Sequence, residues 1–312
     1  MNTRSPLQPR PTTIVRAPRL AGRLGLDLFL VSETFQETGS FKFRAAANVA
    51  AHVPHPLLLA ASSGNFGQAL ARAATLAGKR SIIVMPDRSA KVKVEAVREF
   101  GGEVVFVDTA RETRAAKVAE VAAAHPEAYL GSAYDDELVI AGNASLGREL
   151  AALAAGGLEF DTVVVPVGGG GLSSGVVRGL REGGHGAAVW GAEPLLSNDA
   201  ARSLRAGRRL ENENESDTLA DGARTLSLGE RNWEILRGGL AGIVEVDEPA
   251  IRDGLRLLSE LANLKAEPTG ALALGALLTD PGRFRDRRIA CVVSGGNVDP
   301  AAYAALLRPP LD

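Results

Sequence analysis

The chain has 312 residues, which is too many for one small hydrophobic core and suits two α/β lobes. Its 35 basic and 37 acidic side chains leave a formal net charge of −2, and the arginines are dispersed along the chain. With no basic stripe or basic patch interleaved with aromatic residues, the sequence argues against a nucleic-acid or anionic-membrane partner.

The first extended run, at residues 28–31, leads into Thr38-Gly39-Ser40-Phe41-Lys42-Phe43-Arg44 and then into a helix-forming stretch at 45–50. We place Ser40 as the N-cap, which puts Lys42 in the first helical turn. There the positive end of the helix dipole disfavours an ammonium group, so a partly buried lysine tends towards the neutral amine that forms Schiff bases with carbonyls. The alternative is a solvated lysine in an ordinary N-terminal turn.

A second strand, loop and helix follow. The apolar run at 57–61 precedes the polar loop Ser62-Ser63-Gly64-Asn65-Phe66-Gly67-Gln68, and a helix is expected at 69–77. The backbone N–H groups, two hydroxyls and one side-chain amide of this loop suit an anion such as a carboxylate. Alternatively, Ser62 or Ser63 only caps the helix.

Four consecutive glycines follow a buried run at 162–167. The sequence Gly168-Gly169-Gly170-Gly171-Leu172 then leads into a helix. Bare backbone N–H groups at a helix N-terminus let a phosphate approach closely. The string lacks the ending of a Walker A motif and contains no G-x-G-x-x-G register, so it does not predict a nucleotide site. A flexible tight turn is the alternative, but it does not explain the entropic cost of four glycines.

The last buried run, at 288–293, ends in Ser294-Gly295-Gly296-Asn297. Apolar strands alternate with helical stretches along the chain, which is the βαβ pattern of parallel sheets. The strands are expected at 81–84, 103–107, 162–167, 189–192, 242–246 and 289–293. Because ligands gather at the carboxyl ends of such strands, the loops described above are expected to converge.

Taken together, the four segments resemble the pyridoxal-phosphate enzymes of the tryptophan-synthase-β family, called fold type II, and within it the threonine/serine dehydratase and serine racemase group. The resemblance runs from about residue 11 to residue 297, and it extends to Glu33, Ile140-Ala141-Gly142, Ala220-Asp221-Gly222 and Glu267-Pro268-Thr269-Gly270. It implies a two-lobed α/β fold with doubly wound, mostly parallel sheets. The large cofactor-binding domain would comprise residues 1–52 and 143–312, and the small domain residues 53–142, with no C-terminal regulatory domain.

The resemblance also implies how the cofactor, pyridoxal 5'-phosphate, is held. Lys42 would bind it covalently and later move protons. Phe41 would pack beside its ring, Asn65 would bond its 3′-oxygen, Glu267 would lie near the ring, and Ser294 would meet the pyridine nitrogen. The phosphate would lie against Gly168, Gly169, Gly170, Gly171 and Leu172. A neutral hydroxyl at Ser294 cannot keep the pyridine nitrogen protonated, which suits β-elimination over transamination.

On the substrate side, the resemblance implies that Ser62, Ser63, Gly64 and Asn65 hold the substrate carboxylate. In racemases and some hydroxyaspartate dehydratases, a serine at the position of Ser63 is an acid/base on the face opposite the lysine. Whether Ser63 has that catalytic role or only binds the carboxylate through its amide stays open. Arg114 aligns with a position that can face a substrate carboxylate, although a solvated arginine is the preferred interpretation.

We therefore predict β-elimination of a β-hydroxy amino acid such as L-threonine or L-serine to a 2-oxo acid and ammonia. The alternatives are a serine racemase or a 3-hydroxyaspartate dehydratase, and then a β-replacement synthase. Phe66 and Asn143 depart from the common pattern of the group and put the preferred amino acid in doubt. A non-catalytic protein would be expected to lose Lys42, and a dinucleotide oxidoreductase needs a glycine fingerprint after its first strand.

The remaining predictions concern the protein's surroundings. Cys291 is the single cysteine and lies in an apolar strand, which fits a reducing cytoplasm. We find no apolar stretch of membrane-spanning length and no signal peptide, so a soluble cytoplasmic protein is expected, and the resemblance implies a homodimer. Acidic residues at 211–217 offer oxygen ligands, but a polar surface loop is the preferred interpretation and no metal is predicted.

Overall fold

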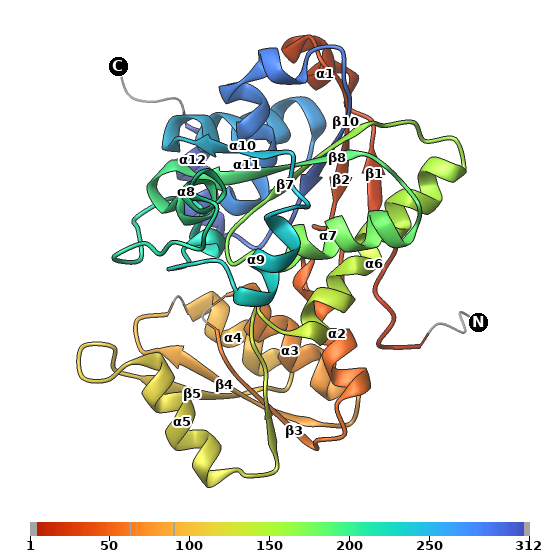
Figure 1. Cartoon of the computed structure of the whole chain (residues 1–312). Helices are drawn as coiled ribbons and strands as arrows, with labels where there is room; N and C mark the ends of the chain where they lie inside the picture. The colour runs from red at the N-terminus through yellow and green to blue at the C-terminus, as the bar shows by residue number, and fades with distance from the viewer. Residues whose placement is uncertain (1–4, 63, 90, 309–312) are drawn as a thin grey trace.

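The computed structural model describes residues 5–62, 64–89 and 91–308, and these form two sheets, each covered by helices (Figure 1). The six-stranded sheet has the order β1-β2-β10-β7-β8-β9, and the four-stranded sheet has the order β5-β4-β3-β6. The first comprises β1 (Thr13–Val15), β2 (Asp27–Ser32), β7 (Thr162–Pro166), β8 (Ala188–Pro194), β9 (Gly242–Val246) and β10 (Arg288–Val293). The second comprises β3 (Leu57–Ala61), β4 (Arg80–Pro86), β5 (Glu103–Val107) and β6 (Ala128–Leu130).

Neighbouring strands are parallel except at β1, which pairs with β2 in the antiparallel direction. The predicted class, an α/β fold with mostly parallel sheets, is therefore confirmed. The short edge strands β1 and β6 have three residues each and were not expected from the sequence. Neither is long enough to give a clear alternation of apolar and polar residues.

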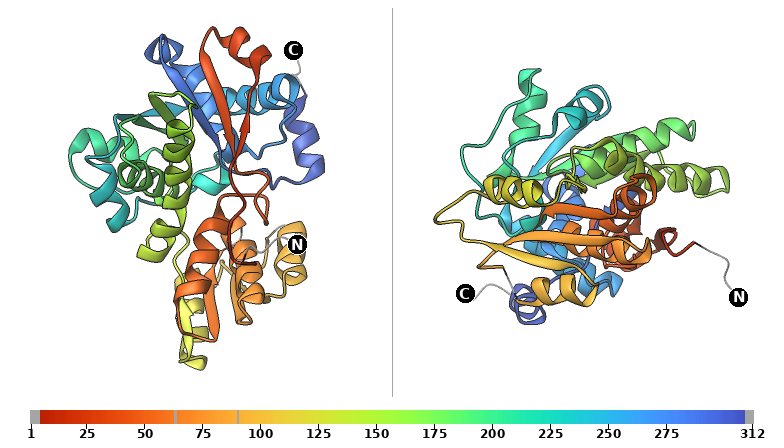
Figure 2. Two further views of the ribbon diagram at one scale, coloured as in Figure 1. Left: turned by 90° about the vertical axis from the view of Figure 1, so that its right-hand side faces the viewer. Right: turned by 90° about the horizontal axis from the view of Figure 1, so that it is seen from below.

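Helices cover both sheets. The described helices are α1 (Pro18–Leu24), α2 (Lys42–His52), α3 (Asn65–Leu76), α4 (Lys91–Glu99), α5 (Arg114–Ala124), α6 (Glu137–Ala155), α7 (Gly171–Glu182), α8 (Asp199–Ala206), α9 (Glu230–Leu236), α10 (Glu248–Ala262), α11 (Pro268–Thr279) and α12 (Pro300–Leu307). We call the four-stranded sheet with α3, α4 and α5 the small lobe. The six-stranded sheet with the remaining helices, apart from α2, is the large lobe. The lobes lie one above the other in Figure 1 and in the left view of Figure 2, and α2 packs against α3 on one side and α6 on the other.

The six-stranded sheet is apolar on both faces because helices cover both. In β2, Leu28 and Leu30 belong to a cluster shared with α10 and α11, whereas Phe29 and Val31 belong to a second cluster shared with α6 and α7. Strands buried on both faces read as continuous apolar runs, which is why they can be located from the sequence.

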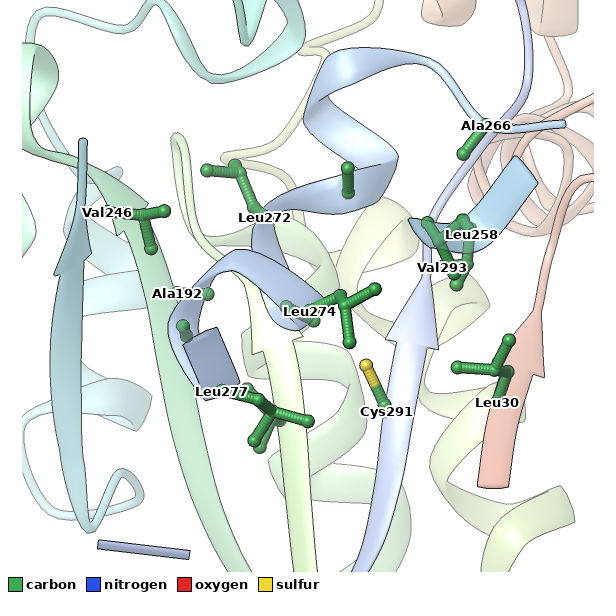
Figure 3. Close-up of a cluster of buried hydrophobic side chains, with 14 of the residues drawn as sticks. Leu30, Ala192, Val246, Leu258, Ala266, Leu272, Leu274, Leu277, Cys291 and Val293 are labelled. Atoms are coloured by element: carbon green, nitrogen blue, oxygen red, sulfur yellow. The ribbon is translucent and has the colours of Figure 1, made fainter. Parts of the chain in front are cut away.

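Helix α11 is the most deeply buried helix of the large lobe, since every residue from 268 to 277 is buried. It packs across β7, β8, β9 and β10. Figure 3 shows Leu272, Leu274 and Leu277 of α11 above the strands that carry Ala192 and Cys291. The Cys291 thiol is fully buried there, as expected for a small core residue.

Helix α6 corrects one expectation. Its 19 residues are long and apolar enough to cross a membrane by length and composition alone, although half of the window is buried inside the protein. The helix packs against α7 and α2 and contributes Leu146 and Leu150 to the core, so its apolar character is explained by internal packing. The predicted domain boundary between residues 142 and 143 falls inside this helix, and the domain limits stay a prediction.

Candidate active site

Three loops that carry predicted cofactor residues leave adjacent strands of the six-stranded sheet. Lys42 follows β2, Ser294 follows β10 and Gly168 follows β7, and these strands are parallel neighbours. Their carboxyl ends therefore open on the same edge. The N–H of Phe41 donates to the carbonyl of Ser294 at 3.0 Å, which ties the first loop to the second.

The small lobe supplies the other side of the site. Asn65 follows β3 and Ala133 follows β6, and these two strands are also parallel neighbours. The Nζ atom of Lys42 donates to the carbonyl oxygen of Ala133 at 2.6 Å, and the Nδ2 atom of Asn65 donates to Oε1 of Glu267 at 2.7 Å. The candidate site thus lies where the strand ends of the two lobes meet.

Lys42 is the first residue of α2, and its amine lies among apolar groups. The nitrogen is 5.0 Å from the ring centre of Phe41 and 5.6 Å from that of Phe66. Burial lowers the pKa of Lys42 to about 8, against an opposing effect of the negative charge on Glu267. At pH 7 roughly a tenth of the amine is therefore neutral, and the cause is the loss of solvation on burial.

The predicted N-cap was wrong. Phe41 is the N-cap residue of α2, and Ser40 lies one position earlier, in an isolated antiparallel bridge with Gly295. The Ser40 hydroxyl is buried and has no partner among the described residues. Ser40 therefore ties this loop to the end of β10 instead of capping the helix.

Arg44, two residues after Lys42, anchors the start of α2. Its guanidinium bonds Glu33 at 2.6 and 2.9 Å, and both side chains are 0% exposed. It also bonds both carboxylate oxygens of Glu149 on α6, at 2.8 and 3.0 Å. This buried cluster holds the end of β2, the first turn of α2 and α6 in one arrangement.

Glu267 is buried at the start of α11, and its negative charge acts on Lys42. Burial raises the pKa of its carboxyl to about 8, and the negative charge of Asp221 adds to the effect. The hydrogen bond from Asn65 and the charges of Lys93 and Lys42 act in the opposite direction. Lys42 and Glu267 therefore both have pKa values near 8, and the charge on each favours the charged form of the other.

The glycine loop presents N–H groups without partners. The N–H groups of Gly168, Gly169 and Gly170 have no acceptor within the described ranges, and those of Gly171 and Leu172 open the first turn of α7. The carbonyls, in contrast, are engaged. Gly169 O accepts from Asn232 Nδ2 at 2.8 Å, and Gly171 O accepts from Asn143 Nδ2 at 3.0 Å.

Close packing explains why this loop needs glycine. A Cβ atom on Gly169 would lie 2.3 Å from the Tyr134 ring, and one on Gly171 would lie 3.0 Å from the Tyr134 backbone. Gly170 has a φ of +91°, which favours glycine. A flexible turn is therefore not the explanation, because the loop is held between Tyr134 and α9.

The residues around Lys42 fit the predicted cofactor. The hydroxyl of Ser294 is buried and has no hydrogen-bond partner among the described residues, as expected for a group that awaits a ring nitrogen. The N–H groups of Gly168, Gly169 and Gly170, which have no acceptor among the described residues, are of the kind that binds a phosphate at a helix N-terminus. Together with the partly neutral amine of Lys42, these groups match the aldehyde, ring and phosphate of pyridoxal phosphate.

The loop between β3 and α3, residues 62–64, is described only in part, because Ser63 lies outside the described residues. The Ser62 hydroxyl accepts from the N–H groups of Gly64 and Gly67, at 3.3 and 3.0 Å, and Gly64 is the N-cap residue of α3. The Ser62 N–H donates to the carbonyl of Val84 at 3.1 Å. The predicted role of Ser62, Ser63 and Gly64 in binding a carboxylate stays a prediction.

Ion pairs also connect the lobes. Arg114 on α5 pairs with Glu215, and Lys93 on α4 pairs with Asp221 at 2.5 Å. The Arg114 side chain is 39% exposed, in line with the preferred interpretation of a solvated arginine. Its role towards a substrate stays a prediction.

Several residues of the site were not assigned a role from the sequence. Asn232, Tyr134 and Ala133 support the glycine loop and Lys42, but they stand in no motif that could have revealed them. Asn297 ends the Ser-Gly-Gly-Asn segment, and its side chain donates to Asn65 Oδ1 at 2.9 Å. The contacts of these residues with the site become visible only once the fold brings the loops together.

Comparison with known proteins agrees with this site. The family described as pyridoxal-phosphate dependent enzyme matches residues 6–295. The chain is 34% identical over 305 residues to the L-threo-3-hydroxyaspartate ammonia-lyase of Pseudomonas sp, covering 95% of this chain and 93% of that protein. The crystal structure of the threonine deaminase of T.th. matches with a TM-score of 0.86 and 40% identity, covering 93% of this chain and 92% of that one. Maize serine racemase matches with a TM-score of 0.89 and 30% identity, covering 95% and 91%.

The chain therefore belongs to the family of pyridoxal-phosphate dependent enzymes. The predicted family, the fold type II architecture and the cofactor, pyridoxal 5'-phosphate, are confirmed. The similar proteins named above are ammonia-lyases and a racemase, the two classes that the sequence predicted.

Proposed function

We propose that the protein is an ammonia-lyase that removes the β-hydroxyl and the amino group from a small β-hydroxy amino acid, releasing a 2-oxo acid and ammonia. The observation that carries the proposal is the environment of Lys42. Its amine is buried with a pKa of about 8. The loop after β10, which is bonded to Phe41, carries the buried hydroxyl of Ser294, which has no hydrogen-bond partner among the described residues. Ammonia-lyases among the similar proteins support the reaction class.

The residues divide the binding of the cofactor between them. Lys42 would bind it covalently, the Ser294 hydroxyl would donate a hydrogen bond to its ring nitrogen, and Asn65 would donate to its ring oxygen. The N–H groups of residues 168–172 would hold its phosphate, and Phe41 would pack beside the ring. The bound cofactor supplies an electron sink for the bonds at the substrate Cα.

Lys42 would act as the general base once the substrate amine has taken its place. An amine with a pKa near 8 accepts a proton at neutral pH and returns it readily, which is the property of an effective acid/base group. The carbonyl of Ala133, 2.6 Å from Nζ, can accept a hydrogen bond from either the neutral or the charged amine. It would therefore orient Nζ throughout the reaction.

Ser294 would favour elimination. A serine hydroxyl has no negative charge, so it would leave the ring nitrogen unprotonated and would limit how far charge from Cα spreads into the ring. Loss of a β-leaving group needs less of this delocalisation than transamination does. No carboxylate is bonded to the Ser294 hydroxyl among the described residues.

Threonine, serine and 3-hydroxyaspartate are the proposed substrates. They share a β-hydroxyl, and the similar proteins include a threonine deaminase and a hydroxyaspartate ammonia-lyase. The test is to load the protein with pyridoxal phosphate, offer the L- and D-forms of all three, and assay 2-oxo acid and enantiomer. We expect 2-oxo acid from at least one of them, and its absence with every form would contradict the proposal.

Racemisation is the second candidate, favoured by the similarity to maize serine racemase. It would require a second acid/base on the face opposite Lys42, and Ser63 is the residue proposed for it. In the same assay, Ser63→Ala should keep elimination and lose any exchange between enantiomers. Equal exchange in the variant and the parent would remove Ser63 from this role.

We further propose that the protein is a cytoplasmic homodimer whose partner in catalysis is an amino acid. The buried, unpaired Cys291 is compatible with a reducing compartment. Light scattering of the purified protein tests the dimer, which predicts twice the chain mass of 32.5 kDa.

A further inference from the structure

Asn297 joins three segments of the site through one side-chain amide. Its Nδ2 atom donates to the carbonyl oxygen of Thr38 at 2.7 Å and to Oδ1 of Asn65 at 2.9 Å. Thr38 begins the loop that ends at Lys42, Asn297 follows β10, and Asn65 opens α3 of the small lobe. The two donated bonds therefore connect the lobes at the site itself.

The Thr38 carbonyl fixes the orientation of both amides. A backbone carbonyl can only accept, so the atom of Asn297 that faces Thr38 must be its NH2 group. The same NH2 group faces Asn65, which must therefore present its oxygen. This leaves the NH2 group of Asn65 on the other side, where it donates to Glu267 at 2.7 Å.

Close packing keeps Asn297 in place. A Cβ atom on Gly39 would lie 2.2 Å from Oδ1 of Asn297, so the glycine, with a φ of +72°, lets the amide lie directly on the backbone. The N–H of Gly296 also donates to the carbonyl of Gly39 at 2.9 Å. The amide of Asn297 is thus held on one side by the loop before Lys42 and bonded on the other to Asn65.

We propose that Asn297 is a positioning residue that locks the Asn65 amide with its NH2 group towards the cofactor. This inference rests on the proposed function, in which Asn65 donates a hydrogen bond to the ring oxygen. An amide NH2 has two hydrogens. One is used by Glu267, and the second is available to the ring oxygen. Without Asn297, the Asn65 amide could turn over and present an acceptor to an oxygen that needs a donor.

The test is a double-mutant cycle on the protein loaded with pyridoxal phosphate. Asn65→Ala, Asn297→Ala and the double variant are titrated with pH while the visible absorption band of the bound cofactor is followed. A donated hydrogen bond stabilises the charged ring oxygen, so its loss should move the midpoint of the band titration upwards by about one pH unit in each single variant. If Asn297 acts through Asn65, the double variant should shift no further than Asn65→Ala alone.

Two further variants separate the loss of the hydrogen-bond donor from a general effect of mutation. Asn297→Asp keeps the size of the side chain but replaces the donor by an acceptor, so it should shift the midpoint in the same direction as Asn297→Ala. Asn198→Ala is the matched control. The side-chain amide of Asn198 also donates to a glutamate, Glu245, at 2.7 Å, but Asn198 lies in the large lobe, at the N-cap of α8. It should leave the midpoint unchanged. Thermal unfolding of each variant checks that it is folded.

Two results would overturn the inference. One is a titration midpoint in both Asn297 variants that equals that of the parent protein. The other is a midpoint shift in the double variant that equals the sum of the two single-variant shifts. Either can occur while the parent protein still releases 2-oxo acid, in which case only the role of Asn297 fails. A parent protein that binds the cofactor without any turnover would instead overturn the proposed function.

Discussion

The Nζ atom of Lys42 lies 2.6 Å from the carbonyl oxygen of Ala133 and donates a hydrogen bond to it across the boundary between the lobes. Lys42 follows the large-lobe strand β2, and Ala133 follows the small-lobe strand β6. A carbonyl attracts either protonation state of the amine without forcing it to be charged. The lysine is thereby held in position while burial keeps its pKa near 8.

The first prediction concerns the pH dependence of cofactor capture by the cofactor-free protein. Only the neutral amine attacks the aldehyde of pyridoxal phosphate, and the pKa of Lys42 is lowered by burial to about 8. The rate of capture, followed by rapid-mixing absorbance, should therefore rise with pH and level off above about 8. An inflection at the ordinary lysine value of 10.5 would contradict the buried site.

The second prediction concerns Glu267 and the stability of the cofactor-free protein. Burial raises the pKa of Glu267 from 4.5 to about 8, so the folded protein keeps a proton that the unfolded chain has lost in this pH window. The contribution of the Glu267 proton to the free energy of unfolding is fully present below pH 4.5 and is lost as the pH rises towards 8. Glu267→Gln should therefore lose less stability than the parent between these values.

The measurement is the free energy of unfolding by urea near the two ends of this window, at about pH 5 and about pH 8. Glutamine keeps an oxygen that can accept from Asn65, so the bond to Asn65 is retained. Glu95→Gln on α4 is the control, because it removes a carboxylate that is exposed instead of buried. Identical pH dependence in Glu267→Gln and the parent would show that the carboxyl titrates normally.

Much of the fold could be predicted because the strands of the two sheets are continuous apolar runs. The strand ends carry the recognisable loops, so the convergence of Lys42, Ser294 and the glycine loop followed from parallel topology. The N-cap assignment to Ser40 failed because Phe41 occupies the N-cap position and the backbone of Ser40 pairs with Gly295 after β10. Asn232 and Ala133 could not be found, since their contributions depend on contacts between segments far apart in the chain.

The third prediction tests the packing of the glycine loop. Gly169→Ala places a methyl group against the Tyr134 ring, 2.3 Å from its nearest atom, so either the ring or the loop must move. We expect pyridoxal phosphate to bind about tenfold more weakly, as measured by equilibrium titration, because overpacking of this kind costs about 1–3 kcal/mol. Gly186→Ala is the matched control, since a Cβ there meets nothing within 4 Å. Equal affinity in both variants would argue against a role for the loop.

The fourth prediction concerns the buried Arg44 cluster. Arg44→Met leaves Glu33 with 0% exposure and without its partner, which should destabilise the protein by about 3–5 kcal/mol in denaturant unfolding. Arg148→Met breaks the pair with Glu182, whose side chains are 48% and 43% exposed, and should cost less than about 1 kcal/mol. The double variant Glu33→Leu/Arg44→Met should recover part of the loss. A small effect of Arg44→Met would contradict the anchoring of α2 by this cluster.

The measurement that tests the role of Lys42 most directly is to locate the lysine that binds the cofactor covalently. The protein is loaded with pyridoxal phosphate, reduced with borohydride, digested and examined by mass spectrometry, with Lys42→Ala and Lys79→Ala treated in parallel. We predict that the added mass lies on the peptide containing Lys42, that Lys79→Ala retains it, and that Lys42→Ala loses both the label and the release of 2-oxo acid. A label on another lysine, or full turnover in Lys42→Ala, would contradict the role of Lys42.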